Sequence, residues 1–244
     1  MNFKTKAELE KYVREELQIP NVDFSNMDLE VASSIVEALT KCLNNYPELH
    51  STIEAIGSPM YLWNVMERLK FIAFYPEEIE DLQKNQERQI SGKNATNDNP
   101  MALYPITIRG KQKFCIELEP SLINQKKDDI IRNIARIRNH TSVQEEDTVQ
   151  SILYHEFGHM LDHVLKISKD CEVFSIIVGN DVSSEEFYYK SRDLLAEGFA
   201  NYYASGEPSM ASALLVSYIN KRYNEKFMNK EEKPKTYQKN KSSK

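Results

Sequence analysis

Three of the five histidines in this 244-residue chain fall within nine residues, in the stretch SILYHEFGHMLDHVL that runs from Ser151 to Leu165. The apolar residues around them recur at three- and four-residue steps, which predicts an amphipathic helix. At about 100° per residue, His155 and His159 point away from the centre of the apolar stripe. Residues four apart share one helix face and lie about 6 Å apart. The stretch therefore predicts a helix that presents two imidazoles side by side.

Two imidazoles at this spacing can bind one metal ion, and zinc accepts such nitrogen ligands at about 2.0–2.1 Å. Glu156 directly follows His155, where its carboxylate can take a proton from a zinc-activated water. The pattern His-Glu-x-x-His is typical of zinc sites in which this glutamate is the general base. The competing interpretation is a surface helix whose histidines are solvated and bind nothing.

His163 is the third histidine of the row, two turns or about 12 Å along the helix from His155. On a continuous helix it cannot share a metal ion with both of the others. The longer zinc pattern with a third histidine also fails, because Asp162 and Leu165 occupy its Gly and His positions. We expect His163 to be exposed or to support the metal ligands from outside.

A zinc site needs a third protein ligand, and the stretch SSEEFYYKSRDLLAEGFANYYA from Ser183 to Ala204 offers two acids. Asp193 and Glu197 are four apart and share one face of a predicted helix. Ser191 is expected to cap this helix. The competing interpretation is a solvated acid pair on a surface helix.

HEFGHMLD followed by DLLAEGFANYY resembles the zincin metallopeptidases. It is most similar to the branch that contains the anthrax lethal factor catalytic domain, secreted bacterial Pro-Pro endopeptidases, and zincin domains of phage and mobile-element polyproteins. The resemblance covers Thr148 to Ala204. It implies a zincin-like fold, bound Zn²⁺ and hydrolysis of a peptide bond, with His155 and His159 as ligands and Glu156 as the base.

The family register makes the first acid of the second helix the metal ligand and the next one an orienting partner of a histidine. Here the first acid is Asp193, one methylene shorter than the glutamate of the family. Glu197 could instead reach the metal directly, and its length gives it a slight preference. Related enzymes also place a tyrosine hydroxyl over the metal, a role open to Tyr189 and, next to it, Tyr188. Aromatic packing is the competing role for both tyrosines.

The rest of the chain predicts a mainly helical protein with a small mixed β-sheet, of class α+β. Residues 1–83 are expected to form a helical region, with helices at Met27 to Leu43 and after Pro59, the latter turning Ile72 or Ala73 inward. The polar residues 84–100 are expected to be a loop or linker. The metallopeptidase domain would span residues 101–228, and the basic residues 229–244 would be a disordered tail.

Within the expected metallopeptidase domain, two β-rich runs flank Gly110-Lys111 and predict a type II′ hairpin. Pro105 cannot donate a ladder hydrogen bond, so its strand is expected at a sheet edge that could receive an extended peptide. A helix is expected from Leu122 to Arg138.

Net charge and composition bear on partners and location. The formal net charge is −6, which argues against nucleic acid as the main partner. The N-terminus is too polar for a signal peptide, and no apolar run approaches the roughly 20 residues that span a bilayer. Three widely spaced cysteines suggest no disulfide framework. We therefore expect a cytoplasmic protein with a polypeptide substrate and no membrane partner.

Two other functions fit the same residues. One is a phage or mobile-element structural or interaction protein whose zincin fold holds a structural or weakly active metal site. The other is an effector that cleaves one protein inside a host cell.

Overall fold

A computed structural model describes residues 3–73, 101–118, 149–170 and 184–228, together with residue 126 and a few residues between 80 and 87. For residues 72–73 and 184–190 only the backbone is described. Most of the polar segment 84–100, the helix expected from Leu122 to Arg138 and the basic tail 229–244 lie outside the described residues.

The N-terminal helices begin at side-chain caps. Helix α1 (Lys6–Glu15) follows Thr5, α2 (Leu29–Asn45) follows Asp28, and α3 (Pro59–Leu69) follows Ser58; each cap accepts a backbone N–H of the first turn. A short 3₁₀ helix, η1 (Pro47–Thr52), comes after α2. The predictions of α2 and α3 from periodicity are confirmed. Helix α3 ends earlier than expected, because Lys70 takes a left-handed conformation.

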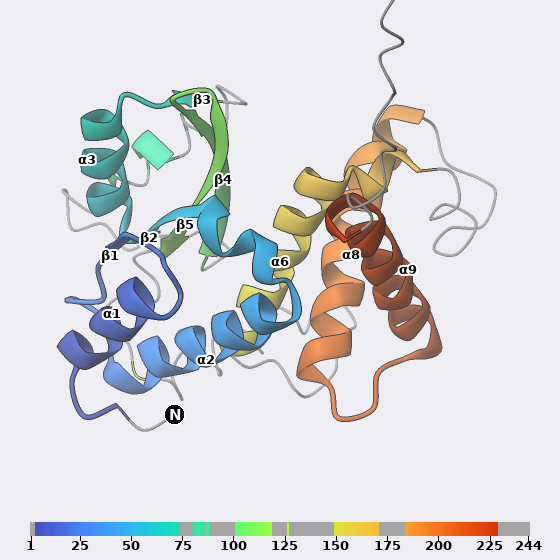
Figure 1. Cartoon of the computed structure of the whole chain (residues 1–244), viewed down its shortest axis with the longest axis horizontal. Helices are drawn as coiled ribbons and strands as arrows, with labels where there is room; N and C mark the ends of the chain where they lie inside the picture. The colour runs from blue at the N-terminus through green and yellow to red at the C-terminus, as the bar shows by residue number, and fades with distance from the viewer. Residues whose placement is uncertain are drawn as a thin grey trace, which may run out of the picture.

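The sheet is small and mixed, as predicted. Its strands are β1 (Asn21–Val22), β2 (Ile53–Gly57), β3 (Ile72–Ala73), β4 (Met101–Ile108) and β5 (Lys111–Leu118), in the spatial order β1-β2-β5-β4-β3. Strands β1, β2 and β5 run parallel, while β4 is antiparallel to β5 and β3. Strands from both sides of residues 84–100 therefore share one sheet, and Ile72 and Ala73 belong to it rather than to α3 (Figure 1).

Two features of the β4–β5 hairpin differ from expectation. The connection is Arg109-Gly110, with φ of 50° and 75°. Positive φ at both positions is the type I′ pattern, not type II′. In addition, β4 is not the outermost strand, because β3 pairs with it at Thr107 and Ile106. Pro105 lies directly beyond that short pairing, where its missing N–H costs no ladder bond to β3.

The C-terminal half is helical. It comprises α6 (Val149–Leu165), the 3₁₀ turn η2 (Ile167–Lys169), α8 (Ser184–Ala204) and α9 (Met210–Phe227). Helix α6 lies between the sheet and the α8–α9 pair (Figure 1). Helix α8 begins seven residues before Ser191, so this serine is not its cap but a buried residue within it. Tyr188 and Tyr189 lie inside the helix rather than before it.

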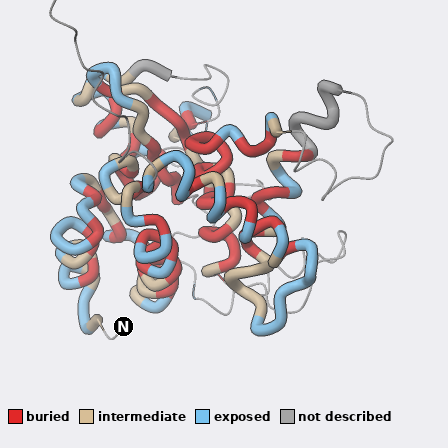
Figure 2. The backbone as a smooth tube through the Cα atoms, turned by 45° about the vertical axis from the view of Figure 1, so that its right-hand side comes forward, coloured by how far each residue is buried: buried red, intermediate tan, exposed pale blue. Residues whose placement is uncertain are grey.

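The core has two parts, one on each face of the sheet. The larger part joins the inner faces of α1, α2, α6, α8 and α9 to Phe114 and Ile116 of β5, and the smaller part joins α3 to Cys115 of the same strand. Alternate residues of β5 thus face opposite cores. Figure 2 shows the buried backbone running through the centre, with exposed positions on the outer helix faces. No helix in the described part of the chain is long and apolar enough to cross a membrane.

Candidate metal centre

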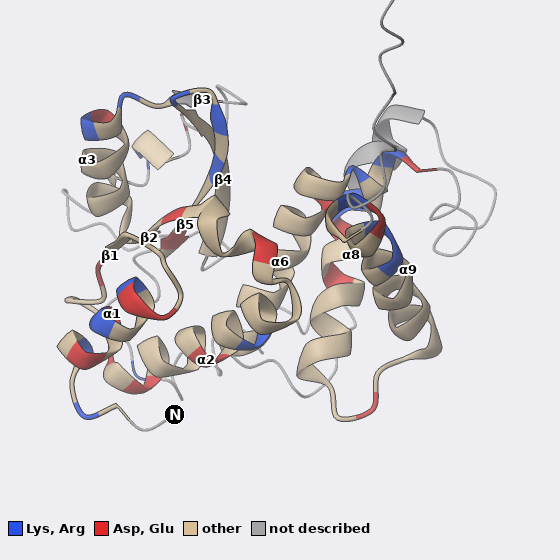
Figure 3. Ribbon diagram, viewed as in Figure 1, with Lys and Arg blue, Asp and Glu red and all other residues tan. Residues whose placement is uncertain are grey.

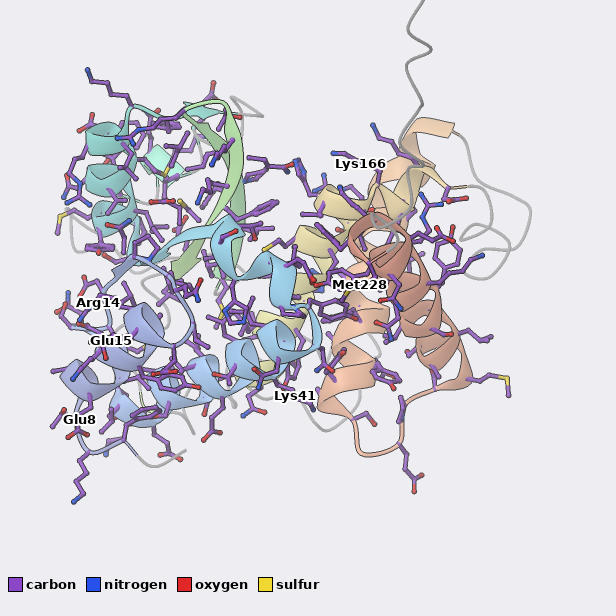
Figure 4. The ribbon with its side chains drawn as sticks, in the orientation of Figure 1. Glu8, Arg14, Glu15, Lys41, Lys166 and Met228 are labelled. Carbon is purple, nitrogen blue, oxygen red and sulfur yellow. The ribbon has the colours of Figure 1, made fainter. Side chains whose placement is uncertain are left out.

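Helices α6 and α8 run antiparallel and pack closely. Tyr154 contacts Tyr203 at one end of the pair, with ring centroids 5.5 Å apart. In the middle, a Cβ added to Gly158 would lie only 2.8 Å from the Cα of Ala196. Figure 4 shows Lys41 of α2 near one end of the pair and Lys166 at the other. The absence of a side chain at residue 158 lets the two backbones approach, and this approach brings the histidines of α6 to the acids of α8.

His155 and His159 are the two residues of α6 from 151 to 165 that are not buried. Each side chain is 16% exposed. Their Nε2 atoms lie 3.0 Å apart, and their rings are nearly perpendicular, at 86°. Without a metal, one Nε2–H can donate a hydrogen bond to the other Nε2. The pair therefore turns the same ring nitrogen of each histidine to one point.

The two acids of α8 approach different ring nitrogens. Oδ1 of Asp193 lies 3.7 Å from Nε2 of His159, which is the nitrogen that faces His155. Oε1 of Glu197 lies 3.6 Å from Nδ1 of His155, on the far side of that ring. Asp193 is 71% exposed and Glu197 47% exposed, so both carboxylates border solvent. Figure 3 colours the acidic positions of α8 red and the basic positions of α9 blue.

These distances can be compared with those of a zinc site. Ligand atoms about 2.0–2.1 Å from a tetrahedral zinc ion lie about 3.3–3.4 Å from one another. The Nε2–Nε2 distance of 3.0 Å is close to this spacing, and the His159–Asp193 distance of 3.7 Å is slightly longer. Among the residues that the structure describes, no group of three or more His, Cys, Asp or Glu side chains is arranged to hold a metal ion. To hold zinc, the two Nε2 atoms would have to separate by about 0.3 Å, and a carboxylate would have to move inward as the third ligand.

The electrostatics keep His159 neutral. Burial lowers its pKa to about 3, and the nearby His155 and Arg192 add to this effect. A neutral imidazole is the form whose free lone pair binds a metal. For Asp193, partial desolvation beside α6 raises the pKa of the carboxyl although much of the side chain is exposed, while His155 and Arg192 act in the opposite direction.

The remaining candidate residues lie as follows. Glu156 is 3% exposed and follows His155 on α6. Tyr188 and Tyr189 are in the first turns of α8, but their side chains lie outside the described residues. His163 is buried rather than exposed, and its ring packs edge-on against Phe114 with centroids 5.5 Å apart. The alternative that His163 is exposed is therefore wrong, because its ring packs on Phe114 of β5. Burial lowers the pKa of His163 to about 4.

Sequence reasoning missed one polar group beside this site. The Asp162 carboxylate is buried and accepts hydrogen bonds from the N–H of Ser168, at 2.6 Å, and from its hydroxyl, at 2.8 Å. Nε of Arg192 lies 3.6 Å from the same carboxylate. An acid within the apolar run of α6 was a visible signal, but the sequence does not show that its partners come from η2 and α8.

Comparison with known proteins identifies no relative. No protein-family model matches the chain, and neither a curated protein nor a solved structure matches it. The case for a metal centre therefore depends on the two helices and the side chains that they carry.

Proposed function

We propose that this chain is a zinc-dependent metalloendopeptidase with a zincin-like fold. The observation that carries the proposal is the approach of His155 Nε2 and His159 Nε2 to 3.0 Å, beside two carboxylates of a neighbouring helix. Two imidazoles four residues apart are suited to a shared zinc ion, and a helical glutamate between them is suited to base catalysis.

The distances favour Asp193 as the third ligand. Its carboxylate approaches the Nε2 side of the histidine pair, where zinc would bind, whereas that of Glu197 approaches Nδ1 of His155. A histidine that binds a metal through one nitrogen commonly donates the N–H of the other to a carboxylate. This assignment reverses the slight preference that side-chain length gave to Glu197, and it agrees with the register of the resemblance.

The chain's own residues then divide the work of hydrolysis. When bound, zinc would polarise the scissile carbonyl and make water more acidic. Glu156 accepts a proton from the attacking water and passes it to the leaving amine. Tyr189 is four residues before Asp193 on α8, so it shares the face of that ligand. It is therefore preferred over Tyr188 as the hydroxyl that stabilises the oxyanion.

Strand β4 offers a place for the polypeptide substrate. It packs against α6, and within the described residues β3 pairs with Thr107 and Ile106 of it and no further. An extended peptide could add to the β4 edge along Met101–Pro105, with main-chain hydrogen bonds giving affinity.

The proposal is tested with the zinc-loaded protein and a library of internally quenched peptides. Wild type should cleave a subset of the library, and Glu156→Gln should cleave none of it. If wild type binds zinc but cleaves nothing, the interaction protein with a structural metal site becomes the better account. If it binds no zinc, the proposed function is wrong.

A further inference from the structure

Asp162 joins three elements of the fold through one buried carboxylate. Helix α6 ends after Leu165, and Lys166 turns the chain back in a left-handed conformation. Oδ1 of Asp162 accepts the N–H of Ser168 in η2, and Oδ2 accepts the Ser168 hydroxyl. Oδ2 also lies 3.6 Å from Nε of Arg192, which reaches it from α8. The two hydrogen bonds from Ser168 of η2 hold the Asp162 carboxylate in place. The position of Arg192 therefore depends on the position of this carboxylate.

This contact lies next to the candidate metal centre. Asp162 is three residues after His159 and therefore on the same side of α6. Arg192 directly precedes Asp193 on α8. The Asp162–Arg192 bridge is thus one helical turn away from the approach of Asp193 to His159.

We propose that Asp162 and Arg192 are positioning residues of the zinc site. Their contact sets the rotation and the axial position of α8 on α6, and this brings the Asp193 carboxylate to the Nε2 atoms of the histidine pair. The inference deepens the proposed function and depends on it, because it requires that His155, His159 and Asp193 bind zinc.

The physical argument compares two kinds of contact between the helices. The close packing of Gly158 on Ala196 sets the distance between the axes, but apolar packing is weakly directional. The Asp162–Arg192 contact is an ion pair at 3.6 Å, longer than a hydrogen bond, and it acts through charge. A nearly buried carboxylate strongly favours the geometry that keeps its charge paired. The side chains of Asp162 and Arg192 are 4% and 20% exposed, so solvent screens their contact little. Removing either partner should loosen Asp193 while leaving both histidines in place.

The test measures zinc affinity by competition with a chromogenic chelator for Asp162→Asn, Arg192→Gln and the double variant. Each single variant should bind zinc about 10–100-fold more weakly, the usual effect of losing a group that orients a ligand. The double variant should be no weaker than the weaker single variant, because both substitutions break the same contact. The absorption spectrum of the Co²⁺-loaded singles should also change, since it reports the ligand geometry.

Arg222→Gln is the matched control. Nη1 of Arg222 lies 2.9 Å from Oδ2 of Asp170, so it forms a shorter and more exposed bridge from α9 to the residue after η2. This variant should lower thermal stability while keeping wild-type zinc affinity and the wild-type Co²⁺ spectrum.

The outcomes separate the two proposals. Absence of zinc binding by wild type would overturn the proposed function itself. If wild type binds zinc and the folded Asp162→Asn and Arg192→Gln variants bind it as tightly, only the positioning role is overturned. Should Asp162→Asn fail to fold, Arg192→Gln decides. Equal losses of zinc affinity in Arg192→Gln and Arg222→Gln would also overturn the positioning role, since general destabilisation would explain both.

Discussion

Oδ1 of Asp193 lies 3.7 Å from Nε2 of His159, and the same nitrogen lies 3.0 Å from Nε2 of His155. This relationship joins an acid of α8 to a histidine pair of α6 at one point. Glu197, one turn further along α8, approaches the opposite nitrogen of His155 at 3.6 Å. The two acids therefore approach different ring nitrogens, and the first prediction tests whether their roles differ.

Asp193→Asn should weaken zinc binding more than Glu197→Gln. Loss of Asp193 removes a direct ligand, whereas loss of Glu197 removes an orienting partner and should cost about 10–100-fold in affinity. Chelator competition on both variants measures the difference. The opposite order would assign the ligand role to Glu197, and wild-type affinity in both would place the third ligand elsewhere.

Glu156→Gln should keep zinc and the fold but lose hydrolysis. Glutamine has nearly the same size as glutamate, but it cannot accept the proton of water. Metal content, circular dichroism and peptide cleavage should be measured on the same preparation. A variant that cleaves at the wild-type rate would remove Glu156 from the mechanism.

Gly158→Ala should destabilise the protein. Alanine gains about 1 kcal/mol in helix propensity, but the new Cβ would lie 2.8 Å from the backbone of Ala196, and overpacking typically costs about 1–3 kcal/mol. The clash should dominate, and separation of α6 from α8 should also weaken zinc binding.

Gly206→Ala is the control for this substitution, because a Cβ there meets nothing within 4 Å. Urea unfolding of the two variants should show a lower free energy of unfolding for Gly158→Ala and an unchanged one for Gly206→Ala. Equal stability of both variants would mean that the close approach of the helices is not required.

His163 should make the zinc-free protein less stable as the pH falls. Burial lowers its pKa in the folded state to about 4, below the ordinary value of about 6.5. Between these values the unfolded chain binds the proton and the folded chain does not, so stability decreases as the pH falls from about 6.5 to 4. His163→Gln should reduce this slope in urea unfolding, and an unchanged slope would contradict the assignment.

The sequence predicted the elements whose signals are local. The three- and four-residue spacing in Val149–Leu165 and Leu29–Asn45 identified both helices. Burial follows the helical period in α2, whereas α6 is buried on nearly all sides and leaves His155 and His159 only partly exposed. The β4–β5 hairpin also followed from its two β-rich runs, but the parallel strands β1 and β2 lie in residues 1–83, where only helices were expected. The type of the hairpin turn was wrong, because the strands continue to Ile108 and resume at Lys111, which moves the turn back by one residue.

Features that depend on tertiary contacts were harder to predict. The burial of His163 results from the packing of α6 on β5, and the role of Asp162 depends on partners in η2 and α8. The sequence also did not distinguish Asp193 from Glu197, because both residues have the correct spacing for one helix face, whereas the distances show which ring nitrogen each one approaches. Spacing along one helix can identify a candidate ligand pair, but it does not show which groups of another helix meet it.

Metal content is the most direct test of the central claim that His155 and His159 bind zinc. Elemental analysis of the purified wild-type protein after dialysis against zinc buffer should give about one zinc per chain. The double variant His155→Ala, His159→Ala should retain none while keeping its helical circular dichroism. A wild type that takes up no zinc, or a double variant that keeps one zinc per chain, would contradict the account.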